Sequence, residues 1–143
     1  MAVTASPLWD HQREAIDAAL RTGLVSTGRA TVVLPCGTGK TRVGSEIAQQ
    51  AAPGGRVLIV EPTIELVGQT LHAWRQAHGD DALGRTVALC SDPGVMDQRG
   101  QELRDNHAAV TTSPAELSEL ASGEGRVTVV STYAGMRVLA DAH

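Results

Sequence analysis

The sequence predicts an α/β fold in which a parallel sheet is flanked by helices. Short continuous apolar runs, such as "RVLIVE" at 56–61, are typical of strands buried on both faces. They alternate with segments whose apolar residues recur at helical spacing, which implies βαβ units. The 143 residues are enough for one domain over 1–143 and too few for two, so no second domain is expected.

The first half of the chain has the clearest pattern. A helix is expected over 10–23, with Gly23 as its C-terminal stop. Apolar runs predict buried strands at 30–34 and 56–61, and apolar residues at helical spacing predict a helix over 41–52 that "PGG" ends.

A capping box predicts a helix in the second half. Ser113 would be the N-cap, Pro114 the first helical residue and Glu116 the third. Residues 91–108 are polar, and no element is assigned to them. The other predicted elements are helices over 64–79 and 134–143 and strands over 86–91 and 126–132.

Charge and cysteine content narrow the class of protein. A net charge of -4 argues against a free-standing basic nucleic-acid binder, although backbone amides and hydroxyls could still hold a strand. Cys36 and Cys90 fit neither zinc spacing nor a disulfide framework, which favours a reducing, cytoplasmic setting. No apolar run approaches the roughly 20 residues of a membrane span.

The segment "PCGTGKT" lies between a predicted strand and a predicted helix, which is the context of a phosphate-binding loop. Gly37 and Gly39 permit the positive φ angles that turn backbone N–H groups inward. Lys40 would reach the β and γ phosphates, and the Thr41 hydroxyl would bind Mg²⁺. The first glycine of the usual pattern is replaced by Leu34, so a glycine-rich turn with a chance lysine is the alternative.

Lys40 is the only lysine in the chain, whereas the other cations are arginines. A guanidinium is a wide planar fork, and a flexible ammonium can enter a loop already filled by backbone amides. The phosphate loop is therefore the place where this chain requires lysine.

Three segments that flank the loop narrow the choice among families of P-loop proteins. "LWDHQREAIDAAL" precedes it, and "VLIVEPTIELVGQT" and "VVSTYAGM" follow it. Over residues 8–139, these motifs and "LPCGTGKT" resemble the N-terminal ATPase domain of superfamily 2 helicases and translocases, in particular the XPB-like and type I restriction-like group. The resemblance implies a P-loop NTPase fold of the RecA-like kind, ATP and Mg²⁺ as cofactors, and nucleic acid as partner, DNA in preference to RNA.

The resemblance also implies roles for individual residues. Gln12 would hydrogen-bond the adenine edge, and Trp9 would lie near the base or instead pack on its helix. Lys40 and Thr41 would serve catalysis, and Thr41 would also be the metal ligand. The nucleotide would be held by Trp9, Gln12, Cys36, Gly37, Thr38, Gly39, Lys40 and Thr41.

Hydroxyl residues after two strands resemble the family's nucleic-acid contacts. Pro62 and Thr63 match its motif Ia, and Thr63 could also cap the following helix. Thr132 and Tyr133 match the "TY" motif. Thr111 and Thr112 lie near a further motif, but a capping turn explains them equally well.

The family's next motif, an apolar strand ending in Asp-Glu, is not found. "ADAH" at 140–143 follows the "TY" motif too closely and is interpreted as helix. In the family two strands lie between those corresponding to 30–34 and 56–61, so we expect an incomplete sheet in which the other strands pair among themselves. The chain alone should then be marginally stable, weak in nucleic-acid binding and inactive as an ATPase. Its partners would be the rest of a helicase chain or another exposed sheet edge.

Two other functions stay open. "GTGKTRVGSEIA" resembles the loop and first helix of small P-loop kinases, but that leaves the upstream glutamine and "PTIELVGQT" unexplained. A non-catalytic nucleotide-binding module is the second alternative. A G protein is excluded, because its guanine-reading motif needs a second lysine.

Overall fold

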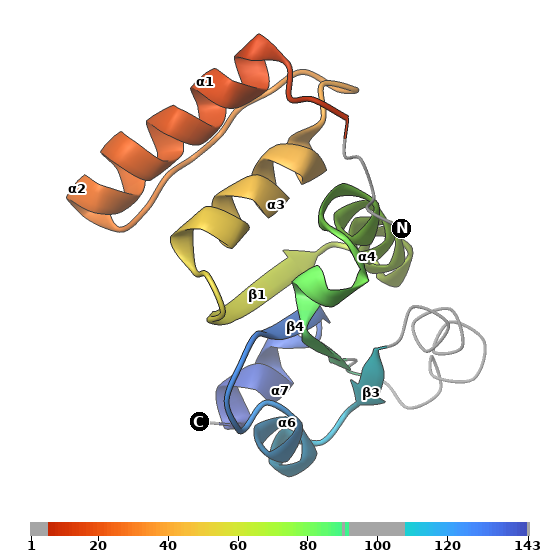
Figure 1. Cartoon of the computed structure of the whole chain (residues 1–143). Coiled ribbons are helices and arrows are strands. Elements are labelled where there is room, and N and C mark those ends of the chain that lie inside the picture. The colour runs from red at the N-terminus through yellow and green to blue at the C-terminus, as the bar shows by residue number, and fades with distance from the viewer. Residues whose placement is uncertain (1–5, 90, 92–107, 143) are drawn as a thin grey trace.

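The computed structural model describes residues 6–89, 91 and 108–142. These residues form an α/β fold with a four-stranded, all-parallel sheet in the order β1-β4-β2-β3 (Figure 1). The strands are β1 (Arg56–Glu61), β2 (Arg85–Leu89), β3 (Ala109–Thr111) and β4 (Val127–Thr132). The helices are α1 (Asp10–Ala18), the π-helical turn η1 (Ala19–Leu24), α2 (Val25–Thr27), α3 (Lys40–Ala51), α4 (Ile64–His78), the 3₁₀ turn η2 (Asp80–Leu83), α6 (Pro114–Leu120) and α7 (Met136–Asp141).

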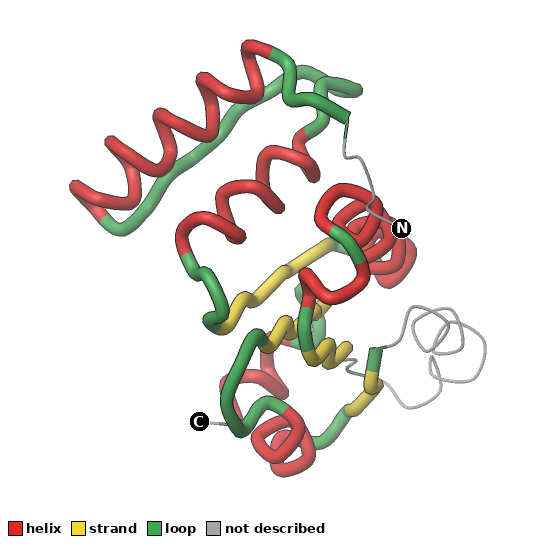
Figure 2. Tube along the Cα trace, viewed as in Figure 1, coloured by secondary structure: helices red, strands yellow, loops and turns green. Residues whose placement is uncertain are grey.

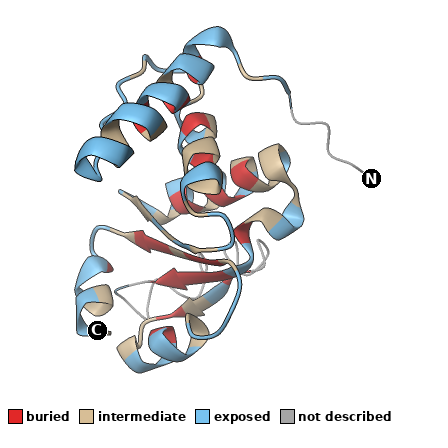
Figure 3. Cartoon of the chain, turned by 60° about the vertical axis from the view of Figure 1, so that its left-hand side comes forward, coloured by how far each residue is buried: buried red, intermediate tan, exposed pale blue. Residues whose placement is uncertain are grey.

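Two apolar clusters fill the two faces of the sheet. On one face, Leu71 and Trp74 of α4 pack with Ala88 of β2 and Val130 of β4. On the other, α6 and α7 cover Val87 and Leu89, and Leu117 of α6 is buried there. The buried residues concentrate in the two inner strands, β4 and β2, and on the helix faces turned toward them (Figure 3). The predicted parallel sheet with flanking helices is therefore confirmed.

The strand predicted at 30–34 is wrong, because these residues form a loop that runs back along α1 and α2 (Figures 1 and 2). The Val33 side chain is 86% exposed. A strand needs a neighbour about 4.8 Å away for its hydrogen bonds, and no strand among the described residues pairs with this segment. The strands predicted at 56–61, 86–91 and 126–132 do pair among themselves, as expected for a sheet with a gap beside β1.

The prediction that Gly23 ends the first helix is also wrong. The helix continues through η1 and α2, and it ends at Gly28, whose φ of 69° is left-handed. Gly23 has a different role, because a Cβ at this position would collide with the Ala30 side chain and the Arg29 carbonyl. Its missing side chain allows residues 29–30 to pass close to the helix.

The region before α6 differs from the prediction in one respect. Ser113 is the N-cap and accepts a hydrogen bond from the Glu116 amide (3.4 Å), as expected. The Glu116 carboxylate accepts instead from the Thr111 hydroxyl, which also accepts from the Ser113 amide (3.1 Å). Thr111 thus belongs to a capping turn, and the short strand β3 that it ends was not predicted.

The C-terminal prediction is confirmed, since residues 136–141 are helical as α7. Cys90 and most of the unassigned segment 91–108 lie outside the described residues. Within the described chain, no helix is long and apolar enough to cross a membrane.

Candidate functional site

The predicted phosphate loop has the backbone of an anion cradle. Gly37 and Gly39 have φ angles of 75° and 84°, and α3 begins at Lys40 directly after them. The amides of residues 39–42 donate to no acceptor in the described part of the chain. Free N–H groups at the start of a helix, together with the helix dipole, favour phosphate. The geometry therefore fits a nucleotide phosphate at this loop.

Helix α1 holds the loop in place through Gln12, which is only 6% exposed. Its Oε1 accepts from the Trp9 amide (3.0 Å), and its Nε2 donates to the Thr38 carbonyl (3.1 Å). The His11 ring nitrogen Nε2 lies 3.2 Å from the same carbonyl. The sequence pointed to Gln12 but not to His11. The feature that could have indicated His11 is its position directly before the glutamine.

Gln12 and Trp9 both retain capacity for a ligand. An amide side chain has two N–H groups and two lone pairs on oxygen, so one of each stays free in Gln12. The Trp9 side chain is 57% exposed, and its ring centroid lies 5.4 Å from that of His11. Trp9 is therefore largely exposed and lies against His11 of α1, which is compatible with both predicted roles, beside a base or packed on its helix.

A hollow of about 500 Å³ separates the first turns of α3 from β1. Lys40 and Thr41 line it on one side, and Glu61 lines it on the other. Glu61 accepts a hydrogen bond from Thr70 (2.8 Å), whereas the buried Trp74 indole N–H, also at the wall, has no partner among the described residues.

The loop suits Mg²⁺ bound together with a nucleotide. In the described chain, no group of three or more His, Cys, Asp or Glu side chains could hold a metal ion alone. Mg²⁺ commonly takes one or two protein oxygens and completes its shell with phosphates and water. The exposed Thr41 hydroxyl, next to the exposed Lys40, is such an oxygen.

The four residues predicted to contact nucleic acid lie together at the carboxyl edge of the sheet. Glu61 is paired with Thr132 in adjacent parallel strands, so Pro62 and Thr63 leave the sheet beside Tyr133. Thr63 caps α4 by accepting from the Leu66 amide (3.3 Å), as expected. The Thr132 hydroxyl accepts from the Gly135 amide (3.3 Å), and Tyr133 is 64% exposed.

The site residues thus form two groups. Trp9, Gln12 and the loop lie together around the start of α3. The hydroxyl residues after β1 and β4 form the second group. The hollow is lined by Lys40 and Thr41 of the first group and by Glu61, which directly precedes Pro62.

Comparison with known proteins identifies the family of this chain. The model of the ResIII family, described as the res subunit of type III restriction enzymes, matches residues 6–129. No curated protein matches the chain. A similar solved structure is a nuclease-deletion mutant of the type ISP restriction-modification enzyme LlaGI in complex with a DNA substrate mimic. The TM-score is 0.69 at 24% identity, which shows a shared fold.

The match covers 96% of this chain and 14% of the LlaGI chain. The order of the motifs, the parallel sheet and the phosphate loop agree with the family match. The chain belongs to the ResIII family of type III restriction res subunits, and it has the fold of a superfamily 2 helicase N-terminal ATPase domain.

Proposed function

We propose that this chain is the ATP-binding portion of a superfamily 2 helicase or translocase that couples ATP hydrolysis to movement on nucleic acid, DNA in preference to RNA. The observation that carries the proposal is the loop from Gly37 to Thr41, with its two positive-φ glycines and free amides. Membership of the ResIII family supports it. The DNA-complexed structure of similar fold favours DNA. Residues 1–143 would then form the N-terminal part of a helicase ATP-binding domain.

Each residue of the loop region has a role in this proposal. The amides from Cys36 to Thr41 surround the phosphates, and the Lys40 ammonium neutralises the β and γ oxygens. Thr41 holds Mg²⁺, which when bound neutralises charge on the transferring phosphoryl group. Gln12 pairs with the adenine edge through its remaining N–H and lone pair, and Trp9 covers the base.

The second group of residues would hold the nucleic-acid backbone. Thr63, Thr132 and Tyr133 offer hydroxyls and backbone amides, which position a phosphate chain without reading its sequence, and Pro62, which has no N–H, would contribute contact through its ring. Such contacts agree with a net charge of -4. The partners that would complete ATPase and motor activity are the remaining helicase segments or another chain at the free edge of β1, and the compartment would be the cytoplasm.

Calorimetry with ATP and GTP tests the nucleotide site. Wild type should bind ATP in preference to GTP, Gln12→Ala should lose that preference, and Lys40→Ala should lose binding of both. Lys40→Arg keeps the charge but should also fail, because the planar fork does not fit the loop. Arg137→Ala, which removes an exposed cation on α7, is the control and should bind normally. Unchanged affinity in Lys40→Ala would rule out the phosphate-loop assignment.

The two alternatives give different results in simple assays. A small-molecule kinase would transfer phosphate to a metabolite without nucleic acid. A non-catalytic module would bind ATP but stay inactive even when the missing helicase segments are supplied. Activation of ATP hydrolysis by DNA in a protein containing this chain and its complementing segments would exclude both.

A further inference from the structure

Helix α3 carries Lys40 and Thr41 at its start, yet no strand of the described sheet leads into the loop before it. Residues 29–35, which connect α2 to the loop, are unpaired with the sheet. The position of the loop must therefore depend on Gln12 and on the contacts that hold α3 against the rest of the fold. The buried residues of α3 are Val43 and Ser45, and Ser45 is 1% exposed. A fully buried hydroxyl in so exposed a helix indicates a specific polar contact.

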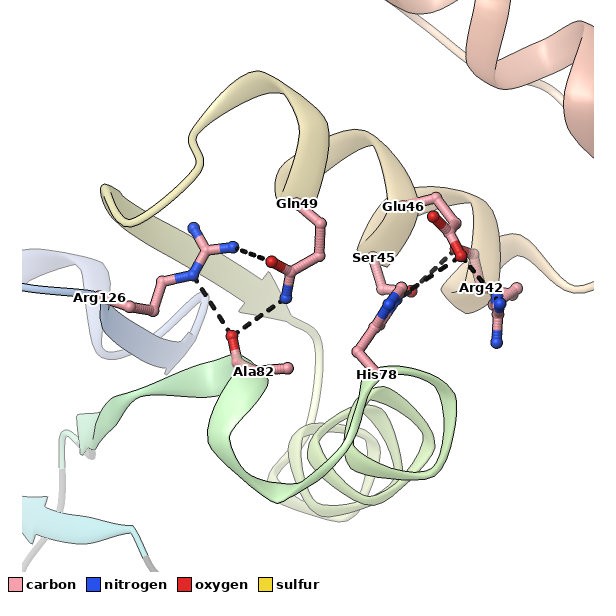
Figure 4. Close-up of polar contacts among 7 residues, drawn as sticks. All are labelled: Arg42, Ser45, Glu46, Gln49, His78, Ala82 and Arg126. Carbon is pink, nitrogen blue, oxygen red and sulfur yellow. Dashed lines mark hydrogen bonds and ion pairs between the residues drawn. The ribbon is translucent and has the colours of Figure 1, made fainter. Parts of the chain in front are cut away.

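That contact is with His78 at the end of α4 (Figure 4). The Ser45 hydroxyl donates to the Arg42 carbonyl (2.8 Å), and its oxygen lies 2.8 Å from His78 Nε2. A hydroxyl has one proton, so Ser45 accepts here and His78 donates from Nε2. Glu46 pairs with Arg42 (2.8 Å) and lies 3.9 Å from His78. We name Arg42, Ser45, Glu46 and His78 the near anchor.

A second set of contacts holds the other end of α3. Gln49 donates to the Ala82 carbonyl (3.0 Å) and accepts from Arg126 (2.7 Å), which precedes β4. Arg126 also donates to the Ala52 carbonyl (2.6 Å) just after the helix. Figure 4 shows the contacts among Gln49, Ala82 and Arg126 on the side of α3 that carries Ser45. We name Gln49, Ala82 and Arg126 the far anchor.

The two anchors differ in their distance from the loop. At 1.5 Å per residue, Ser45 lies about 8 Å along the helix from Lys40, whereas Gln49 lies about 14 Å away. If the near anchor is lost, the far anchor still holds the C-terminal half of α3, and the start of the helix becomes free to tilt. If the far anchor is lost, the start stays in place.

We propose that His78, acting through Ser45, is a positioning residue that fixes the start of α3 and hence the phosphate-binding loop. The inference rests on the proposed nucleotide-binding function and adds to it a residue 38 positions after Lys40 in the sequence. His78 ends α4, whose N-cap is Thr63, so this contact links the helix of the phosphate loop to the helix of the predicted nucleic-acid segment.

The surroundings of His78 keep it uncharged near neutral pH. Burial lowers the pKa of His78 from its ordinary value, Glu46 opposes this, and Arg42 and Arg126 add to it. The Trp74 ring on the same helix lies edge-on to the imidazole, with 6.3 Å between ring centroids. A proton added to His78 at low pH would be repelled by the guanidinium groups of Arg42 on α3 and Arg126 just before β4. Protonation should therefore destabilise the near anchor.

The test compares variants of the two anchors in the full chain. His78→Ala and Ser45→Ala should each weaken ATP binding about tenfold, which corresponds to about 1.4 kcal/mol. His78→Gln retains an N–H donor at similar reach and should restore most of the affinity. Gln49→Ala removes both Gln49 contacts of the far anchor and should lower the melting temperature while leaving the affinity within about twofold of wild type. His72→Ala, at an exposed position of α4, is the matched control.

Hydrogen exchange without nucleotide separates this inference from the proposed function. His78→Ala should speed exchange of the hydrogen-bonded amides in the first turns of α3, from Val43 (3.0 Å to the Gly39 carbonyl) to residue 46, and His78→Gln and Gln49→Ala should not. If wild type binds no ATP but exchange follows this pattern, the positioning role stands and the proposed function fails. If ATP binds and His78→Ala matches wild type in both assays, or if affinity loss simply follows lost stability in Gln49→Ala, the positioning role is wrong.

Discussion

Two glycines of the phosphate loop differ in a way that can be measured. Gly37 and Gly39 have nearly the same left-handed φ, 75° and 84°. No heavy atom lies within 4 Å of the position that a Cβ on Gly37 would take. A Cβ on Gly39 would overlap Nε2 of Gln12. Substitution by alanine therefore imposes the same backbone strain at both positions, but displaces Gln12 at only one.

The expected costs follow from these contacts. A left-handed alanine costs about 1–2 kcal/mol, so Gly37→Ala should destabilise the fold by about that amount. Gly39→Ala should add the loss of the two Gln12 hydrogen bonds, at about 0.5–1.5 kcal/mol each, for a total of about 2–5 kcal/mol. In a Gln12→Ala background the overlap is gone, and Gly39→Ala should cost no more than Gly37→Ala.

Urea unfolding followed by far-ultraviolet circular dichroism measures these free energies without relying on the fluorescence of Trp9, whose environment the variants themselves change. The double-mutant cycle between positions 12 and 39 should give a coupling of about 1–3 kcal/mol. Equal costs for the two glycine variants, or additive costs for Gly39→Ala and Gln12→Ala, would refute the claim that α1 fixes the loop through Gln12.

Four further predictions follow from the same structure. Stability should fall as pH drops below about 6.5, the ordinary pKa of histidine, because the folded state holds the pKa of His78 lower and the unfolded chain takes up the proton first. Melting at about pH 7.5 and 5.5 checks this, and His78→Gln should remove most of the difference. The chain alone should hydrolyse ATP far more slowly than about 1 s⁻¹ in a phosphate-release assay, since an arginine finger alone is worth roughly 10³–10⁵ in related enzymes. Nucleic-acid binding should be weak, independent of sequence and lost between about 50 and 200 mM salt in a filter assay, whereas tight binding at high salt would require a basic surface. The free edge of β1 should promote association, so size-exclusion chromatography should show Leu58→Lys shifted toward monomer, because an edge lysine opposes strand pairing. A wild-type monomer that melts cooperatively above about 60 °C would contradict the incomplete sheet.

The sequence alone determined the features that depend on short-range contacts. Thr63 and Ser113 were predicted as helix caps, and each accepts from an amide three residues later. Gly37 and Gly39 were predicted to have positive φ, because the loop motif requires it and glycine permits it. The strands at 56–61 and 126–132 were found from their continuous apolar runs. The family's strand order also predicted that these strands pair among themselves. The prediction that 56–61 is buried was wrong, because β1 is at the edge of the described sheet and has no buried residue.

Only the tertiary structure decided the features that depend on partners distant in sequence. The apolar run at 30–34 has the composition of a strand, but strand hydrogen bonds need a neighbour, and the described chain provides none at that position. Gly23 looked like a helix stop because nothing in its own segment shows that residues 29–30 return beside it. The contacts of His11 with Thr38 and of Ser45 with His78 join residues 27 and 33 positions apart. Local patterns limit which elements can form, whereas packing decides whether a strand finds a neighbour and which side chains meet.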